Sequence, residues 1–236
     1  MRTARSKPAK TTSASARSKP KRALTASASG TRERILHAAI GEFAAKGYSG
    51  ARIDAICRAS RANPRMIYHY FKGKDGLYVA VLEQVLGELR DEELKLDFEQ
   101  VEPLSGILQL FDFVHDHFGK HPELIQLLSG ENLLGARFLR RSLKIPLVAS
   151  PLIAHIARLL ARGEAAGQFR TGVDPLQLYV LMVALCYFHR SNAHTLSSIF
   201  RQNIAAPDWV KQHRAQAEEM IERYLWRAPP ARRKRH

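Results

Sequence analysis

The residues from Arg52 to Asp75 constrain the fold more than any other part of the chain. Their first half carries three apolar residues at helical spacing, namely Ile53, Ile56 and Cys57. A helix this short is not stable alone, so it must pack against its neighbours. After a break, Asn63 and Pro64 supply an N-cap and a first helical residue. The stretch therefore predicts two short helices joined by a tight turn, over 53–59 and 64–70.

The second short helix has two different faces. Ile67 and Phe71 are four residues apart, so they share one face that can enter a core. The other face carries side chains that suit base edges and phosphates, namely Arg65, Met66, Tyr68 and His69. A face meant only for solvent would more usually carry Glu and Lys. We therefore predict that the outward face contacts a nucleic acid.

Two flanking residues can add contacts to a phosphate backbone. Lys74 is expected in the first turn of the next helix, where its charge opposes the helix dipole. A bound phosphate would remove this conflict; the alternative is a solvated lysine, tolerated at a cost of about a few tenths of a kcal/mol. Tyr48 precedes the first short helix, where its phenol can reach a phosphate or its ring can pack under the turn.

Positive charge is concentrated in the two tails. The formal net charge is +15; residues 1–30 hold eight Lys or Arg and residues 227–236 hold five, with no acid in either, so the tails supply 13 of the 15. Residues 31–78 carry nine basic and four acidic groups, a balance of +5, whereas residues 79–226 carry 15 and 18, a balance of −3. Positive charge thus accompanies the predicted nucleic-acid contact. We expect a disordered basic arm at 1–30 rather than a transit peptide, because the same chemistry recurs at 228–236.

Several other classes of protein are disfavoured. Cys57 and Cys186 lie in apolar helical patterns without zinc-site spacing, so both are expected to be reduced core residues of a cytoplasmic protein. The sequence contains no run of about 18 apolar residues, so a membrane span is not expected. There is no nucleophile beside a base and no glycine-rich phosphate loop, so neither an enzyme nor a cofactor is expected.

Three histidines lie close together in the sequence, at positions 115, 117 and 121. His115 and His117 fall on different faces of a helix, which argues against joint ligation of a metal. We expect surface or capping roles for this group, and no metal site.

Helical periodicity extends through the rest of the chain. A helix over 31–46 is expected to start at a Thr31 cap and to end at Gly47. Further helices are expected near 74–95, 104–119, 122–129, 148–166, 174–200 and 207–226, and no segment reads convincingly as a strand. The prediction is an all-α protein with a three-helix helix-turn-helix domain at 31–78, a helical domain at 79–227 and a basic tail at 228–236.

Residues 31–78 resemble the DNA-binding domain of TetR-type transcriptional regulators. The resemblance is carried by Phe43-Ala44-Ala45-Lys46-Gly47-Tyr48, the helix from Ile53 to Ala59, Ile67-Tyr68-His69-Tyr70-Phe71 and Lys74-Asp75-Gly76-Leu77. It implies a recognition helix from Pro64 to Tyr70 and a C-terminal half that dimerises and binds a small effector. By matching position it implies DNA contacts from Tyr48, Arg52, Asn63, Pro64, Arg65, Met66, Tyr68, His69 and Lys74. Tyr68 and Lys74 would contact the backbone, and Arg65 would read a base.

Three features depart from the family pattern. Arg61 stands where members often have glycine, so either the turn avoids positive φ or Arg61 bears a strain of roughly 1 kcal/mol. Arg52 replaces the usual Thr or Ser cap, and Pro64-Arg65 is not the commonest opening of the recognition helix. These departures affect the operator sequence rather than the fold.

The C-terminal half offers a dimer surface and candidate ligand contacts. The helix over 174–200 begins with an Asp174 cap and is apolar almost all round from Leu178 to Phe188, so it must be covered on several sides. With the helix over 207–226 it is the predicted dimer interface; the alternative is a central core helix. Three polar residues on this apolar helix can contact a ligand or be satisfied core groups, namely Tyr187, His189 and Asn192.

These observations predict a ligand-responsive transcriptional repressor. A homodimer would bind a near-palindromic double-stranded DNA operator and be released by a small effector. The main alternative is a sequence-tolerant architectural nucleic-acid binder, which should lose nearly all affinity without its tails. A helical enzyme acting on an acidic substrate is a less favoured alternative.

Overall fold

The computed structural model describes the backbone of residues 21–96 and 98–226, and the side chains from Gly30 onward except at 97 and 146–150. Residues 1–20 of the predicted arm and the tail from 227 lie outside the described residues. Every regular element in the described part is a helix, and its one isolated β-bridge joins Phe169 to Trp226. The prediction of an all-α fold is confirmed.

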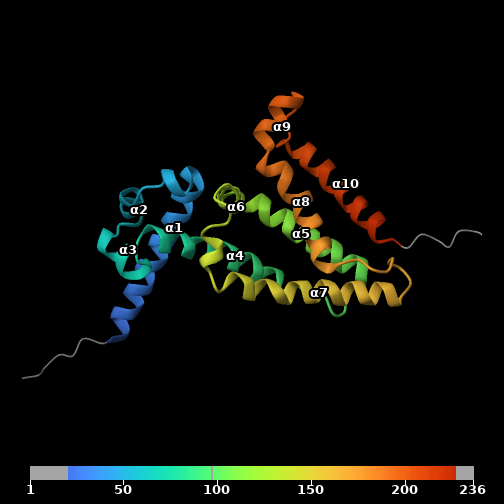
Figure 1. The fold of residues 1–236 in the computed structure, drawn as a ribbon, viewed down its shortest axis with the longest axis horizontal. Helices are drawn as coiled ribbons and strands as arrows, with labels where there is room; N and C mark the ends of the chain where they lie inside the picture. Colours follow the sequence, from blue (N-terminus) through green and yellow to red (C-terminus); the bar gives the residue numbers. More distant parts are fainter. Residues whose placement is uncertain (1–20, 97, 227–236) are drawn as a thin grey trace, which may run out of the picture.

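The N-terminal domain consists of α1 (Lys21–Gly50), α2 (Ile53–Ser60) and α3 (Pro64–Phe71), followed by α4 (Lys74–Glu93) (Figure 1). The predicted start of the first helix at Thr31 is wrong, because the helix begins at Lys21. No proline interrupts residues 21–30, and several of them are good helix formers. Thr31 therefore lies inside the helix, and its Oγ1 accepts a hydrogen bond from Arg34 at 3.1 Å.

The end of the first helix follows the sequence prediction more closely. Gly47 has φ 65° and ψ 175°, outside the helical region, which interrupts α1 where a terminal glycine was expected. One further turn reaches Gly50, and the N–H of Ala51 donates to Gly47 O at 3.1 Å. This turn places Tyr48 between α1 and α2.

The three N-terminal helices share one core with the start of α4. Its fully buried members come from all four helices, namely Ile35, Ala39, Phe43, Ile56, Ile67, Leu77 and Tyr78. Fully burying an Ile, Leu or Phe side chain contributes about 1.5–3 kcal/mol. Each short helix is therefore held by packing rather than by its own propensity.

Gly76 marks the tightest approach between α3 and α4. A Cβ added there would lie 1.8 Å from Phe71 O, whereas one added at Gly87, in the same helix, would meet nothing within 4 Å. We expect Gly76→Ala to lower the free energy of unfolding by about 1–3 kcal/mol. Gly87→Ala should raise it by roughly 0.5–1 kcal/mol, because alanine suits a helix interior better. Urea unfolding followed by circular dichroism measures both; equal effects would contradict the close approach.

The C-terminal domain is a layered bundle in which α4 and α7 lie side by side below α5 and α8 (Figure 1). Its helices are α5 (Pro103–Lys120), α6 (Pro122–Leu133), α7 (Ile145–Ala165), α8 (Pro175–Ser191), α9 (Ala193–Phe200) and α10 (Pro207–Leu225), with a 3₁₀ turn, η1 (Leu139–Arg141). The long helix α4 runs from the N-terminal domain into this bundle, and α6 packs against α1. The two domains are thus joined both along the chain and through α6.

Two of the predicted C-terminal helices differ from the observed ones. The pattern over 174–200 is not one helix but two, because Asn192 ends α8 and precedes α9. The Asn192 side chain donates to Phe188 O at 3.0 Å, the same carbonyl that accepts the Asn192 backbone N–H. Such a side chain competes with the regular helical bonds. In addition, α6 extends to Leu133 rather than 129.

The two cysteines and the expected absence of a membrane span can be compared with the structure. Cys57 and Cys186 are buried free thiols, as predicted. Across the described segments, no helix combines the length and the apolar character that crossing a membrane requires.

Candidate nucleic-acid interface

The turn between α2 and α3 is closed by main-chain bonds. Arg61 adopts φ 52° and ψ 39°, so it takes the left-handed conformation that usually favours glycine. Of the two alternatives for Arg61, the strained one is therefore observed. The N–H of Ala62 donates to Cys57 O at 3.0 Å, and the N–H of Arg61 donates to Arg58 O at 3.3 Å. These bonds satisfy the last carbonyls of α2.

The start of α3 is fixed by its cap. Asn63 has extended backbone angles, and its Oδ1 accepts the Arg65 N–H at 2.9 Å, with Pro64 in the first turn. Ile67 is 0% exposed and Phe71 is 5% exposed. The predicted cap and the predicted inward face are confirmed. Because these residues fix the helix at its start and along one face, the direction of the opposite face is fixed as well.

The outward face of α3 is open to solvent. Its exposed members are Asn63, Pro64, Arg65, Tyr68 and His69, and the Tyr68 side chain is 63% exposed. Met66 differs from the prediction, because it is half-buried and packs against the core. Helix α3 contains no carboxylate, and Arg65 forms no ion pair among the described residues. This face can therefore offer its donors to an anionic partner.

The backbone at the start of α2 is bonded to a residue that the local sequence does not indicate. Arg52, at the cap position, is exposed and makes no side-chain capping bond. Its backbone N–H instead donates to Glu42 Oε1 of α1 at 3.1 Å. This bond, followed by the hydrogen bond from Lys46, lowers the pKa of Glu42. The Arg52 side chain is left free to contact a ligand.

The N-terminus of α4 offers unsatisfied donors beside a cation. Lys74 is the first residue of α4, and Gly73 at the cap position makes no side-chain bond to the helix. The Lys74 Nζ lies 4.8 Å from the centre of the Tyr48 ring and 3.4 Å from Ser49 O. The first N–H groups of a helix, together with a lysine, favour a bound phosphate.

Tyr48 packs under the turn, as one of its two predicted alternatives stated. Its ring lies 4.4 Å from the Phe138 ring and 5.3 Å from the Tyr78 ring. Its hydroxyl donates to Asp75, which also accepts from Arg141 Nη1 at 2.8 Å. The Tyr48 bond, then the Arg141 bond, lowers the pKa of Asp75, whereas burial, followed by Asp75, raises the pKa of Tyr48. Tyr48 thus supports Lys74 rather than projecting into solvent.

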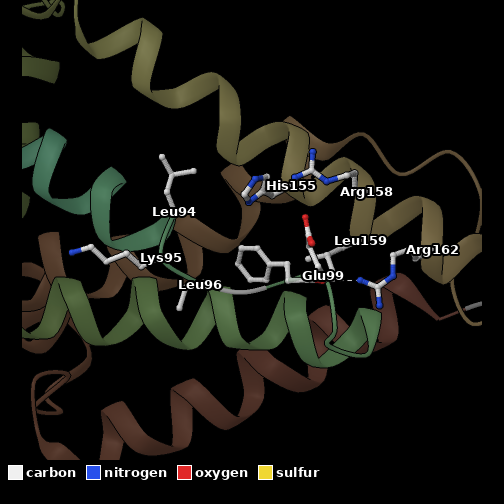
Figure 2. A pocket seen from close by; sticks show the side chains of 9 residues that line it. Leu94, Lys95, Leu96, Glu99, His155, Arg158, Leu159 and Arg162 are labelled. Atoms are coloured by element: carbon white, nitrogen blue, oxygen red, sulfur yellow. Dashed lines mark hydrogen bonds between the residues drawn. The ribbon is translucent and has the colours of Figure 1, made fainter.

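The C-terminal domain contains a cavity of about 490 Å³ between the α4–α5 connection and α7 (Figure 2). Its lining mixes apolar and charged side chains, namely Leu94, Lys95, Leu96, Phe98, Glu99, His155, Arg158, Leu159 and Arg162. Arg162 holds the connection in place by donating to Phe98 O at 2.7 Å and to Val101 O at 2.5 Å. None of the three ligand contacts predicted from sequence lines this cavity.

Those three residues have different surroundings. The Tyr187 hydroxyl is bonded to Ser129 Oγ at 2.7 Å, and Asn192 is bonded within its own helix end. His189 is buried and lines a second cavity of about 270 Å³. Its Nδ1 donates to Leu185 O at 3.1 Å, and its buried Nε2 has no hydrogen-bond partner among the residues that the structure describes. Burial lowers the pKa of His189 to about 4, so the ring is neutral at pH 7 and Nε2 is a free acceptor.

The surface role expected for two of the clustered histidines is wrong. His115 and His117 are 4% and 5% exposed. His117 Nδ1 lies 3.3 Å from Glu92 Oε2, and its ring lies 4.3 Å from that of His121. His121 lies between α5 and α6, at the cap position of each. In the described part of the chain, no three metal-ligating residues are grouped to hold an ion.

The fold and the site together define a class of protein. A capped, exposed, cationic helix follows a short helix and a tight turn, and an open helix N-terminus lies beside it. This arrangement is a helix-turn-helix DNA-binding domain, here joined to a helical C-terminal domain. Residues 35–81 match the family model for bacterial regulatory proteins of the tetR family, and residues 103–221 match that for the tetracyclin repressor-like C-terminal domain. The chain belongs to the TetR family and is a DNA-binding transcriptional regulator.

Relatives and solved structures agree with this assignment. The chain is 33% identical over 180 residues to the HTH-type transcriptional repressor NicS of Pseudomonas putida, covering 75% of this chain and 85% of the relative. It is 29% identical over 150 residues to the HTH-type transcriptional regulator RutR of Escherichia coli, covering 64% and 69%. A putative transcriptional regulator from Streptomyces coelicolor, SCO4942, superposes with a TM-score of 0.61 at 25% identity, covering 83% of this chain and 98% of that one.

Proposed function

We propose that the protein is a dimeric repressor that binds a near-palindromic operator and is released by a small effector. The observation that carries the proposal is α3, whose cap and core contacts direct an exposed, acid-free face outward. Repression is supported by relatives named as transcriptional repressors. The proposal includes a DNA-binding domain at 31–78, an effector-binding and dimerisation domain at 79–227, and a cytoplasmic location.

The contacts with DNA divide into two kinds. Arg65 is proposed to read a base, and Tyr68 and Lys74 to bind phosphates. Tyr48 acts through Lys74, whose Nζ lies over its ring. The remaining proposed contacts are Arg52, Asn63, Pro64, His69 and, from its half-buried position, Met66.

The dimer is proposed to form through α8 and α10. An apolar cleft of about 360 Å³ lies between them, lined by Leu178, Leu181, Ala184, Leu185, Met220, Ile221 and Tyr224. Solvent-exposed apolar surface of this kind marks an interaction site. A two-fold axis there would place two recognition helices about 34–36 Å apart, one turn of DNA.

The effector is proposed to bind inside the C-terminal domain. The cavity between the α4–α5 connection and α7 has a size typical of ligand sites, and it adjoins α4, which leads to the DNA-binding domain (Figure 2). Of the contacts proposed from sequence, Tyr187, His189 and Asn192, His189 lines the cavity of about 270 Å³. To move a conformational equilibrium from 1:99 to 99:1, the effector must prefer one state by about 5.5 kcal/mol.

Base readout by Arg65 gives a direct test. Selection from random DNA should yield a two-fold-symmetric site, and Arg65→Ala should weaken binding by about 1–3 kcal/mol for each half-site and relax one position of each half-site. Arg65→Lys is the matched control, because it keeps the charge but loses the planar fork. It should relax specificity almost as much while retaining more of the affinity for unrelated DNA.

The architectural alternative predicts a different outcome. Such a binder would show no selected site, and Arg65→Ala and Arg65→Lys would change its affinity for all DNA sequences in proportion to charge alone. Selection without a symmetric winner would overturn the proposed repressor function.

A further inference from the structure

The segment that joins α6 to α7 carries four exposed cations, namely Arg137, Arg140, Arg141 and Lys144. Two of them form ion pairs with carboxylates of α4. Arg141 Nη1 lies 2.8 Å from Asp75 Oδ2, and Lys144 Nζ lies 3.1 Å from Glu83 Oε2. Within the described residues, Arg137 and Arg140 form no ion pair.

Besides these two ion pairs, buried groups hold the segment in place. The Phe138 ring is 0% exposed and lies 5.0 Å from that of Tyr78. The N–H groups of Phe138 and Leu139 donate to the buried Glu131 Oε2 at 3.1 and 3.0 Å. The preceding turn needs positive φ at Ala136, at 57°. The cations therefore stand at a fixed place on the surface.

That place adjoins the proposed phosphate site at the start of α4. Lys74 lies over the Tyr48 ring, and the Tyr48 ring lies 4.4 Å from the Phe138 ring. On the Phe138 ring lie the guanidinium groups of Arg137, at 5.3 Å, and Arg141, at 5.6 Å. The segment runs beside α4 where that helix leaves the DNA-binding domain (Figure 1). The Tyr48 and Phe138 rings are thus contacted by cations from both domains.

The charge of this patch is unbalanced. Lys74 and the four cations of the segment make five positive charges against three carboxylates, Asp75, Glu83 and the buried Glu131, a balance of +2. Two bridges suffice to attach the segment, so adhesion between the domains does not explain Arg137 and Arg140. Like charges at close range repel, and a polyanion would remove that repulsion.

We propose that Arg137 and Arg140 bind phosphates of the DNA backbone next to the one at the start of α4. The C-terminal domain would then contribute directly to DNA binding, and the contacted backbone would extend beyond the reach of α3. The inference rests on the proposed function. Because phosphates carry no sequence information, the contribution is the same for operator and unrelated DNA.

Salt dependence tests the proposal in the full-length protein. Operator affinity is measured by fluorescence anisotropy across a potassium chloride series for the wild type, Arg137→Gln, Arg140→Gln and the double variant. Because each substitution occurs in both protomers of the dimer, each single change removes two phosphate contacts and should reduce the magnitude of the slope of log affinity against log salt by about 1.8, and the double change by about twice that. Arg137→Lys should restore the slope, because it keeps the charge.

The control is Arg201→Gln, which removes one exposed positive charge at the end of α9, well away from the DNA-binding domain (Figure 1). Its slope should equal that of the wild type, and thermal melting should show all variants folded. Unchanged slopes for Arg137→Gln and Arg140→Gln, in a wild type that binds its operator, would overturn this inference and leave the proposed function intact. A wild type that binds no DNA would overturn both.

Discussion

A Leu181→Asp variant is expected to be monomeric and to lose at least about 100-fold in operator affinity, because linked binding to two half-sites is lost. Leu181 is 48% exposed and lines the apolar cleft between α8 and α10 beside Met220, which is 59% exposed. At a two-fold interface each substitution occurs twice. Burying an unpaired carboxylate costs several kcal/mol; for comparison, removing one partner of a buried ion pair costs about 3–5 kcal/mol. Sedimentation equilibrium and anisotropy on full and half operators measure the two losses.

The matched control for oligomeric state is Leu133→Asp. Leu133 is 90% exposed at the end of α6, so the same change of side chain there leaves the cleft untouched. The control should remain dimeric. A dimeric Leu181→Asp protein with wild-type operator affinity would show that another surface joins the protomers.

Replacing Phe138 by Ala is expected to lower the free energy of unfolding by about 3–5 kcal/mol. The ring is fully buried and fills the space between Tyr48 and Tyr78, where α6 and η1 meet the DNA-binding domain. Because Tyr48 supports Lys74, operator affinity should fall as well. Urea unfolding is monitored by tryptophan fluorescence, which reports the C-terminal domain through Trp209 and Trp226, and by circular dichroism, which reports both domains. Transitions that do not coincide would show that the two domains unfold apart.

Leu143→Ala provides the comparison, five residues further along the chain. Leu143 is 84% exposed, so its truncation should change the free energy of unfolding by less than about 0.5 kcal/mol. If Phe138→Ala lowered the free energy of unfolding as little as Leu143→Ala, packing of the Phe138 ring between the two domains would not be what joins them.

The DNA-binding half of the fold was largely predictable because its signals are local. Asn63 caps α3 through a bond to Arg65, two residues away, and Ile67 and Phe71 share a face through four-residue spacing. Interactions of such short range leave a pattern in the sequence itself. The helix boundary that failed at Asn192 carries neither a proline nor a glycine, whereas the one at Lys21 follows Pro20, a start signal that the prediction did not use.

The candidate site was predicted in its members but not in their roles. The outward direction of Arg65 and Tyr68 follows from helix geometry, whereas Met66 is drawn inward by neighbouring core residues. The Tyr48 hydroxyl donates a hydrogen bond to Asp75, and the Arg52 N–H at the start of α2 donates one to Glu42 of α1. Neither bond could be predicted, because its partners lie far apart in the chain.

The sequence alone determined the helical class, the helix-turn-helix, the residues of its outward face and the family resemblance. The tertiary structure decided which residues support that face: Arg141 reaches Asp75 across 66 positions, and Phe138 enters the core of another domain. Helical spacing and caps act over about four residues, so they are written in the order of the amino acids. Contacts between domains depend on how completed helices pack, and only the folded chain brings those partners together.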